Sequence, residues 1–355
     1  MAGAVGAAPK RGRFAPYGLL SPGVLWLVLF FMVPVAFLLR ASLSDQPERF
    51  LPSELHFTWR WSNFSRGLDQ FGPQFQHALR NALVAALVIG VVVYAVALLR
   101  RDLWRSTRVG RTLVGALVGV FLGTYVVTST IDGWGDHFQR SFLYSGIATL
   151  LCIAIGYPLA YVIAFRGGSY KNLLLGLVVV PFFTTYLIRT IAWQTILFDE
   201  GPVVSLLRSL GALGHTDRLL ATPGAVIGGL TYNFLPFMVL PIYVSLEKID
   251  RSLVDAARDL YSSPARAFRK VVLPLSLPGV FAGSLLTFIP ASGDFVNSEL
   301  LGSPRTSMIG NAVQNQFLVQ LDYPLAAALS AVLMVIITVA VLVYAKVLGT
   351  EDLTG

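Results

Sequence analysis

Residues 255–274 read DAARDLYSSPARAFRKVVLP, a charged, helix-forming segment between two long apolar runs. The flanking runs, near residues 223–246 and 275–291, approach the roughly 20 residues that a helix needs to span about 30 Å of hydrocarbon. The segment is too polar to cross a bilayer and too regularly patterned for a passive linker. We therefore expect it to form a surface that a cytoplasmic partner binds.

The composition indicates a membrane protein. Hydrophobic residues make up 55% of the 355 residues, charged residues make up 13%, and the mean hydropathy is +0.68. A soluble domain carries roughly 25% charged residues. Helices satisfy backbone polar groups within lipid, so the fold class predicted is an all-α membrane protein with several spans.

Eight transmembrane helices are predicted from the apolar runs. They lie near residues 17–39, 81–99, 112–129, 142–165, 173–197, 223–246, 275–291 and 325–348. The segment FGPQFQHALRNAL from Phe71 resembles WGDHFQRSFLYSG from Trp134, and each leads into a span. This echo favours a six-helix core that carries an inserted two-helix hairpin.

The distribution of charge orients these spans. The net charge is +8, and the basic residues cluster in short loops beside the spans, as the positive-inside rule describes. With both termini cytoplasmic, all of these loops fall inside and an even number of spans results. Nucleic acid is therefore not expected as a partner.

Cysteine and histidine give no sign of a metal site. The single cysteine, Cys152, lies in an apolar span, and the four histidines lack metal-ligand spacing. We expect neither a disulfide nor a bound metal in this chain.

The charged segment is predicted to be two short helices joined by a turn. Asp255 opens the first helix, where a carboxylate complements the helix dipole, and Ala256 and Ala257 leave a small surface for close approach. Ser263 and Pro264 are typical of an N-cap followed by the first helical residue. The second helix has an apolar stripe and is expected to end at Leu273 and Pro274, where the next span begins. The stripe consists of Ala265, Phe268 and Val272.

This arrangement resembles the EAA loop of ABC-transporter permeases of the importer type. The family pattern is Glu-Ala-Ala, a glycine four residues after the second alanine, and later Ile-x-Leu-Pro. Asp255 replaces the glutamate and Tyr261 replaces the glycine, which suits a tight turn, whereas the spacing is kept. The resemblance implies that the loop couples the chain to an ATPase. The residues implied in that contact are Asp255, Ala256, Ala257, Arg258, Asp259, Tyr261, Ser263 and Pro264.

The resemblance extends over most of residues 15–348, the inserted pair excepted. Four segments stand in family order: IGYPLAY from Ile155, PFFTTYLIRTIAW from Pro181, YNFLPFMVLPIYVSLEKID from Tyr232 and IPASGDFVNSELLG from Ile289. Together they are similar to the spermidine/putrescine branch. Related branches carry iron, sulfate, molybdate or opines, and these remain alternatives.

The resemblance also implies the domain order. It gives a cytoplasmic N-terminus and first span (1–40), an extracellular segment (41–80), the inserted hairpin (81–130), a permease core (131–348) with a coupling loop (247–274), and a tail (349–355).

The implied partners are an ATP-binding subunit dimer, a second permease subunit, an extracellular solute-binding protein and membrane lipid. The chain has no G-x-x-x-x-G-K-[ST] loop. It is therefore not expected to be an enzyme or to hold a cofactor, because ATP and Mg²⁺ would bind to the partner ATPase subunits. The implied location is the plasma membrane of a prokaryote.

A polyamine site requires carboxylates for charge and aromatic faces for cation–π contact. Asp294, at the outer end of the seventh span, and Glu299 are the candidate carboxylates. Tyr186, Trp193 and Tyr232 are the candidate aromatic residues.

Arg189 lies within the fifth predicted span, where an ionisable residue is costly and usually paired or functional. We expect it to pair with a carboxylate or with carbonyl groups at the end of a span, with Asp199 or Glu200 as the candidate carboxylates, whereas an anionic substrate would make Arg189 a direct ligand. Asn233 is expected to form hydrogen bonds across helices. An ion-coupled secondary transporter remains the alternative from another class, although such proteins commonly show acidic relays or broken repeats.

Overall fold

The computed structural model describes residues 25–26, 28–46, 56–68, 134–214, 217–250, 252–253, 255–256 and 263–348. The predicted hairpin spans at 81–99 and 112–129 lie outside the described residues. So do four predicted coupling residues, Ala257, Arg258, Asp259 and Tyr261.

Four helices in the described part of the chain are long and apolar enough to cross a membrane. They lie within α7 (Trp134–Arg166), α11 (Pro223–Glu247), α13 (Pro264–Ala267) with its continuation into α14 (Leu273–Ser292), and α17 (Tyr323–Leu348). These helices confirm the spans predicted near 142–165, 223–246, 275–291 and 325–348. The first predicted span contains a shorter apolar helix, formed by the π-helical turn η1 (Val28–Met32) and α2 (Val33–Ser42).

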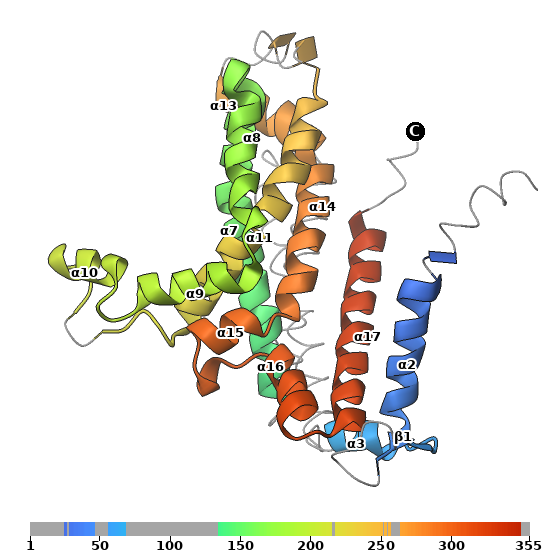
Figure 1. Cartoon of the computed structure of the whole chain (residues 1–355). Helices are drawn as coiled ribbons and strands as arrows, with labels where there is room; N and C mark the ends of the chain where they lie inside the picture. The colour runs from blue at the N-terminus through green and yellow to red at the C-terminus, as the bar shows by residue number, and fades with distance from the viewer. Residues whose placement is uncertain are drawn as a thin grey trace, which may run out of the picture.

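The long helices form a bundle in which α11 packs against both α7 and α14 (Figure 1). Beside it, α17 packs against α2 and against the short helix α3 (Ser62–Leu68). A two-residue antiparallel ladder joins β1 (Ser44–Asp45) to β2 (His56–Phe57) near the C-terminal end of α2. Short helices α15 (Val296–Leu301), η7 (Pro304–Thr306), α16 (Ile309–Gln314) and η8 (Asn315–Val319) connect α14 to α17.

Small residues allow the core helices to approach closely. A Cβ on Gly283 would lie 2.8 Å from the sulfur of Met238, and one on Gly279 would lie 2.5 Å from the carbonyl oxygen of Pro241. Close backbone approach through small residues is a common means of packing helices in membranes. It places the α11 and α14 backbones against each other without large side chains between them.

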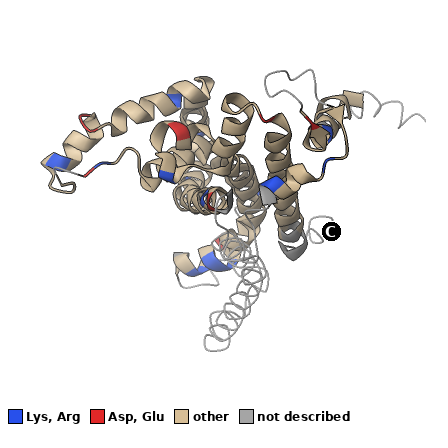
Figure 2. Ribbon diagram, turned by 90° about the horizontal axis from the view of Figure 1, so that it is seen from below, with Lys and Arg blue, Asp and Glu red and all other residues tan. Residues whose placement is uncertain are grey.

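Charged side chains are rare along these helices. In Figure 2, Lys, Arg, Asp and Glu lie mainly in helix ends and connecting segments. Helix α14 contains none, and the only one in α11 is its last residue, Glu247. This distribution is what a hydrocarbon environment requires.

The segment predicted as a span near 173–197 is not one straight helix. The chain instead forms η4 (Gly168–Tyr170), α8 (Lys171–Val179) and η5 (Val180–Phe183), then turns by 93° into α9 (Tyr186–Leu197) and α10 (Pro202–Ser209). Thr184 and Thr185 adopt extended backbone angles at the break. Pro181 lacks the N–H that would continue the helical pattern just before it. Helices α9 and α10 consequently extend sideways from the bundle (Figure 1).

The second helix of the coupling loop does not end at Leu273 and Pro274, as was predicted. It continues from α13 through a π-helical segment, η6 (Phe268–Val272), into α14. Pro274 cannot donate the hydrogen bond of a regular helix, and a wider turn directly before it accommodates that loss. The second helix of the coupling loop and the following span therefore form one continuous helix that contains a π-helical turn.

Candidate functional site

Asp294 lies between α14 and α15, and its carboxylate accepts hydrogen bonds from two sides. The hydroxyl of Tyr186, at the start of α9, donates to Oδ2, and the backbone N–H of Asn297 donates to Oδ1 over 2.8 Å. The Asn297 side chain in turn donates to the Tyr186 hydroxyl. The carboxylate is thus fixed between the broken helix and α15.

Asn233 connects this group to α11. It is 1% exposed, and its amide nitrogen donates to Asn297 Oδ1 over 3.2 Å and to Thr190 Oγ1 over 3.3 Å. Its own amide oxygen is buried without a hydrogen-bond partner among the described residues. One turn earlier, a Cβ on Gly229 would lie 2.5 Å from Asn297 Oδ1, so only glycine allows this approach. The expected interhelical hydrogen bonds of Asn233 are confirmed.

An aromatic group adjoins this polar network. The rings of Trp193 and Tyr232 meet edge to face with centroids 5.3 Å apart, and Phe182 lies 6.5 Å from Tyr232. The guanidinium carbon of Arg189 lies 4.1 Å from the centre of the Phe182 ring and 5.7 Å from that of Tyr186. The rings therefore already hold one cation of the chain itself.

The expected pairing of Arg189 with Asp199 or Glu200 was wrong. Asp199, in the turn that follows α9, forms an ion pair with Arg218 over 3.2 Å. Within the described residues, Nε and one terminal nitrogen of Arg189 are buried without a hydrogen-bond partner. Burial against aromatic rings takes the place of the expected carboxylate.

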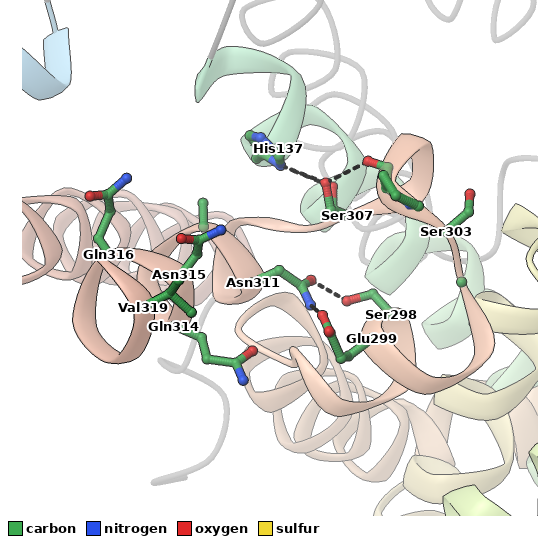
Figure 3. Close-up of a pocket in the computed structure, with 13 residues that line it drawn as sticks. His137, Ser298, Glu299, Ser303, Ser307, Asn311, Gln314, Asn315, Gln316 and Val319 are labelled. Carbon is green, nitrogen blue, oxygen red and sulfur yellow. Dashed lines mark hydrogen bonds between the residues drawn. The ribbon is translucent and has the colours of Figure 1, made fainter. Parts of the chain in front are cut away.

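Glu299 lies apart from this site, on the wall of a cavity of about 530 Å³ (Figure 3). The cavity is bounded by the start of α7, by α15 and by α16 with η8. Asn311 donates to Glu299 Oε2 over 3.0 Å and to the carbonyl oxygen of Phe295 over 3.1 Å, and it accepts a hydrogen bond from Ser298. His137 is within 3.1 Å of the Ser307 hydroxyl on the opposite wall.

At the other end of the bundle, the second helix of the coupling loop contacts α7. The ring of Phe268 meets Tyr157 and Tyr161 edge to face, with centroids 5.8 and 5.7 Å away. The carbonyl oxygen of Ser263 accepts hydrogen bonds from Arg266 and Ala267, which confirms that a helix starts after Ser263.

Nearby residues tie the same end of the bundle together. Lys171 forms an ion pair with Glu247 and lies 5.4 Å from the Tyr243 ring centre. Asp255 and Ala256, the described part of the first coupling helix, are exposed. In Asp250, just before them, the backbone N–H of Ser252 lowers the pKa of the carboxyl.

The structure brings together Asp294, Tyr186 and Asn233 by direct or shared hydrogen bonds, and it places Arg189, Trp193 and Tyr232 beside them. Sequence reasoning missed Asn297, Thr190 and Phe182. Asn297 had a local signal, because an aspartate often bonds to a backbone N–H a few residues later. Thr190 lies one turn after Tyr186 in α9 and joins the group through Asn233 of α11, and Phe182 joins it from the other side of the bend.

Comparisons with known proteins place this geometry in a family. The family described as "Binding-protein-dependent transport system inner membrane component" matches residues 153–348, more than half of the chain. The chain belongs to this family. The matched region of this permease runs from the middle of α7 to the end of α17 and includes the coupling loop.

Individual relatives agree with that assignment. The permease is 41% identical to the spermidine/putrescine transport system permease protein PotB of Haemophilus influenzae over 205 residues, 58% of this chain and 72% of the relative. It is 42% identical to PotB of Escherichia coli over 198 residues, 56% of this chain and 72% of the relative. These matches confirm the family that the EAA-like loop indicated.

A solved structure supports the fold. The chain is similar in structure to one chain in the crystal structure of a bacterial alginate ABC transporter in complex with an alginate pentasaccharide-bound periplasmic protein. The match covers 78% of this chain and 98% of that one. The TM-score is 0.50 and the sequence identity is 16%. At this identity, the likeness concerns the fold alone.

Proposed function

We propose that this permease is one half of the translocation pathway of an ATP-driven importer of polyamines such as spermidine and putrescine. The observation that carries this proposal is the identity of 41–42% to spermidine/putrescine permeases over more than half of the chain. The site chemistry supports it. A fixed carboxylate, Asp294, lies beside an aromatic group that includes Tyr186, Trp193 and Tyr232.

Each part of this site matches a part of a polyamine. The carboxylate of Asp294 suits an ammonium group, and the ring faces suit both the ammonium groups and the methylene chain between them. The contact between Arg189 and Phe182 supports the idea that these rings stabilise a cation. In this proposal Asp294 binds the leading ammonium, and Asn233 with Asn297 keeps the carboxylate network in place.

A second candidate is an importer of a small anion such as molybdate or sulfate. Its support is the pair of buried Arg189 nitrogens that lack a partner among the described residues. An oxyanion bound there would accept hydrogen bonds from both. The two candidates predict opposite ligand charges, so a single ligand comparison separates them.

The remaining parts of the proposal concern partners and orientation. An ATP-binding subunit dimer, which holds ATP and Mg²⁺, docks at the coupling loop of residues 247–274. A second permease subunit completes the pathway, and an extracellular solute-binding protein delivers the substrate. Both termini are cytoplasmic, and lipid covers the outer helix faces.

In this proposal, movement of the ATPase subunits reaches the pathway through the continuous helix formed by α13, η6 and α14. Because Phe268 is held between Tyr157 and Tyr161, a shift of the coupling loop moves α7 and α14 together. Because α11 packs against both helices, it carries that motion to Asn233 and the Asp294 network.

The test is ATP-dependent uptake of labelled spermidine by the reconstituted transporter with its binding protein. The double variant Ala257→Asp with Arg258→Glu places two negative charges on the coupling surface. We expect it to release the ATPase subunits and abolish uptake. Full ATPase binding and full uptake by the double variant would contradict the proposed coupling.

A further inference from the structure

We propose that the cavity around Glu299 is a second ligand site, which binds a primary ammonium group of an alkylamine before it reaches Asp294. The identity of the alkylamine as a polyamine rests on the proposed function. The site itself is argued from the cavity walls alone.

The cavity has the size and the lining of a small-molecule site. At about 530 Å³ it falls within the range of 300–1,000 Å³ that is typical of ligand pockets. Glu299 is the only carboxylate on its described wall. Carboxamides supply most of the remaining polar groups: Asn311, Gln314, Asn315 and Gln316.

Glu299 is exposed at the cavity, and its carboxylate has no basic partner within the described part of the chain. No ion pair joins it to a lysine or arginine there, and its single side-chain hydrogen bond comes from Asn311. Asn311 is 8% exposed, and its second N–H is bonded to the Phe295 carbonyl. Asn311 is therefore a positioning residue that holds one carboxylate oxygen and leaves the other available to a ligand.

The donor set selects an organic ammonium rather than a metal ion. The described residues contain no group of three or more His, Cys, Asp and Glu side chains that could hold a metal. An alkylammonium carries three N–H donors, which one carboxylate and neighbouring carboxamide oxygens can accept. Hydrogen bonds to charged groups are the stronger kind, so Glu299 supplies most of the selectivity.

The position of the cavity gives it a place in the transport path. Asp294 lies two residues before α15, and Glu299 is the fourth of the six residues in that helix. Asp294 faces α9, and Glu299 faces α16. A diamine that leaves the Glu299 cavity would therefore meet the Asp294 site across one short helix.

Cysteine protection tests this directly in the full reconstituted transporter. The native Cys152 is 0% exposed, so a cysteine introduced by Asn315→Cys reports on the cavity wall. Ser209→Cys, on the exposed end of α10, is the matched control. N-ethylmaleimide modification of this chain is followed by mass in the presence of putrescine, 1,4-butanediol or Ca²⁺.

We expect putrescine to slow modification of the Asn315→Cys variant about tenfold, and the uncharged diol to have no effect. Added Glu299→Gln should remove the protection and raise the KM for putrescine uptake about tenfold, which corresponds to about 1.4 kcal/mol. The Ser209→Cys control should react at one rate throughout.

Three results would overturn the inference: no protection by putrescine, equal protection after Glu299→Gln, or protection by Ca²⁺ in place of putrescine. Uptake by the unaltered transporter separates this failure from that of the proposed function. Polyamine uptake without protection refutes the cavity site alone, whereas absence of polyamine uptake refutes the proposed function.

Discussion

Removal of one hydroxyl should reveal how strongly the Asp294 network is coupled. Tyr186→Phe keeps the ring beside Arg189 but takes away the donor to Asp294 Oδ2 and the acceptor for the Asn297 side chain. A hydrogen bond to a charged group contributes about 1.5–3 kcal/mol, and its loss leaves a carboxylate short of one donor. We therefore expect the free energy of unfolding to fall by about 2 kcal/mol.

A double-mutant cycle isolates the contact. Asp294→Asn removes the charge, so the Tyr186 hydroxyl contributes less to the free energy of unfolding when residue 294 is asparagine. The loss of unfolding free energy in the double variant should be smaller than the sum of the losses in the two single variants by about 1 kcal/mol or more. Unfolding of the full chain by SDS in bicelles, measured for the four variants of the cycle, gives the coupling energy.

The control is Tyr170→Phe, the same chemical change in a side chain that is 70% exposed. It should change the free energy of unfolding by less than about 0.5 kcal/mol. Additive losses in the cycle, or equal losses for Tyr186→Phe and Tyr170→Phe, would refute the argument that Tyr186 holds Asp294.

Two further predictions concern Phe268 in η6 and the close contact between α11 and α14. Phe268→Ala should leave the ATPase subunits bound but reduce uptake per ATP hydrolysed at least about threefold; each edge-to-face ring pair lost is worth about 0.5–1.5 kcal/mol. Phe183→Ala, at a ring that is 85% exposed, should keep the normal ratio, and an unchanged ratio for Phe268→Ala would contradict its role. Gly283→Ala should destabilise the chain by about 1–3 kcal/mol because the new Cβ meets Met238, whereas Gly176→Ala has open space and should be neutral or stabilising. Thermal unfolding in detergent compares the two, and equal midpoints would argue against the close packing of α11 and α14.

Much of the fold follows from the sequence because the bilayer imposes simple rules. Apolar length predicted α7, α11, α14 and α17, and a serine–proline pair predicted the start of α13. The spacing of the coupling loop indicated the family, and Asp294, Tyr186 and Asn233 were chosen from residue type and position. Each of these signals is local and depends on a few neighbouring residues.

The failures arise where tertiary context decides. Pro158 and Pro236 lie inside continuous helices, whereas the segment after Pro181 breaks, so proline alone does not predict a bend. Asp199 pairs with Arg218, and the guanidinium of Arg189 lies over Phe182, which precedes that bend. The cavity at Glu299 is assembled from α15, α16 and the start of α7, which lies about 160 residues earlier in the chain, and no linear pattern brings α7 to the other two helices.

The most direct test of the central claim is ATP turnover by the reconstituted transporter with binding protein loaded with one ligand at a time. The account predicts that spermidine or putrescine raises turnover and accumulates inside vesicles only while ATP is supplied. Stimulation by molybdate or sulfate but not by polyamines, or polyamine uptake that continues without ATP and stops when the ion gradient is removed, would contradict it.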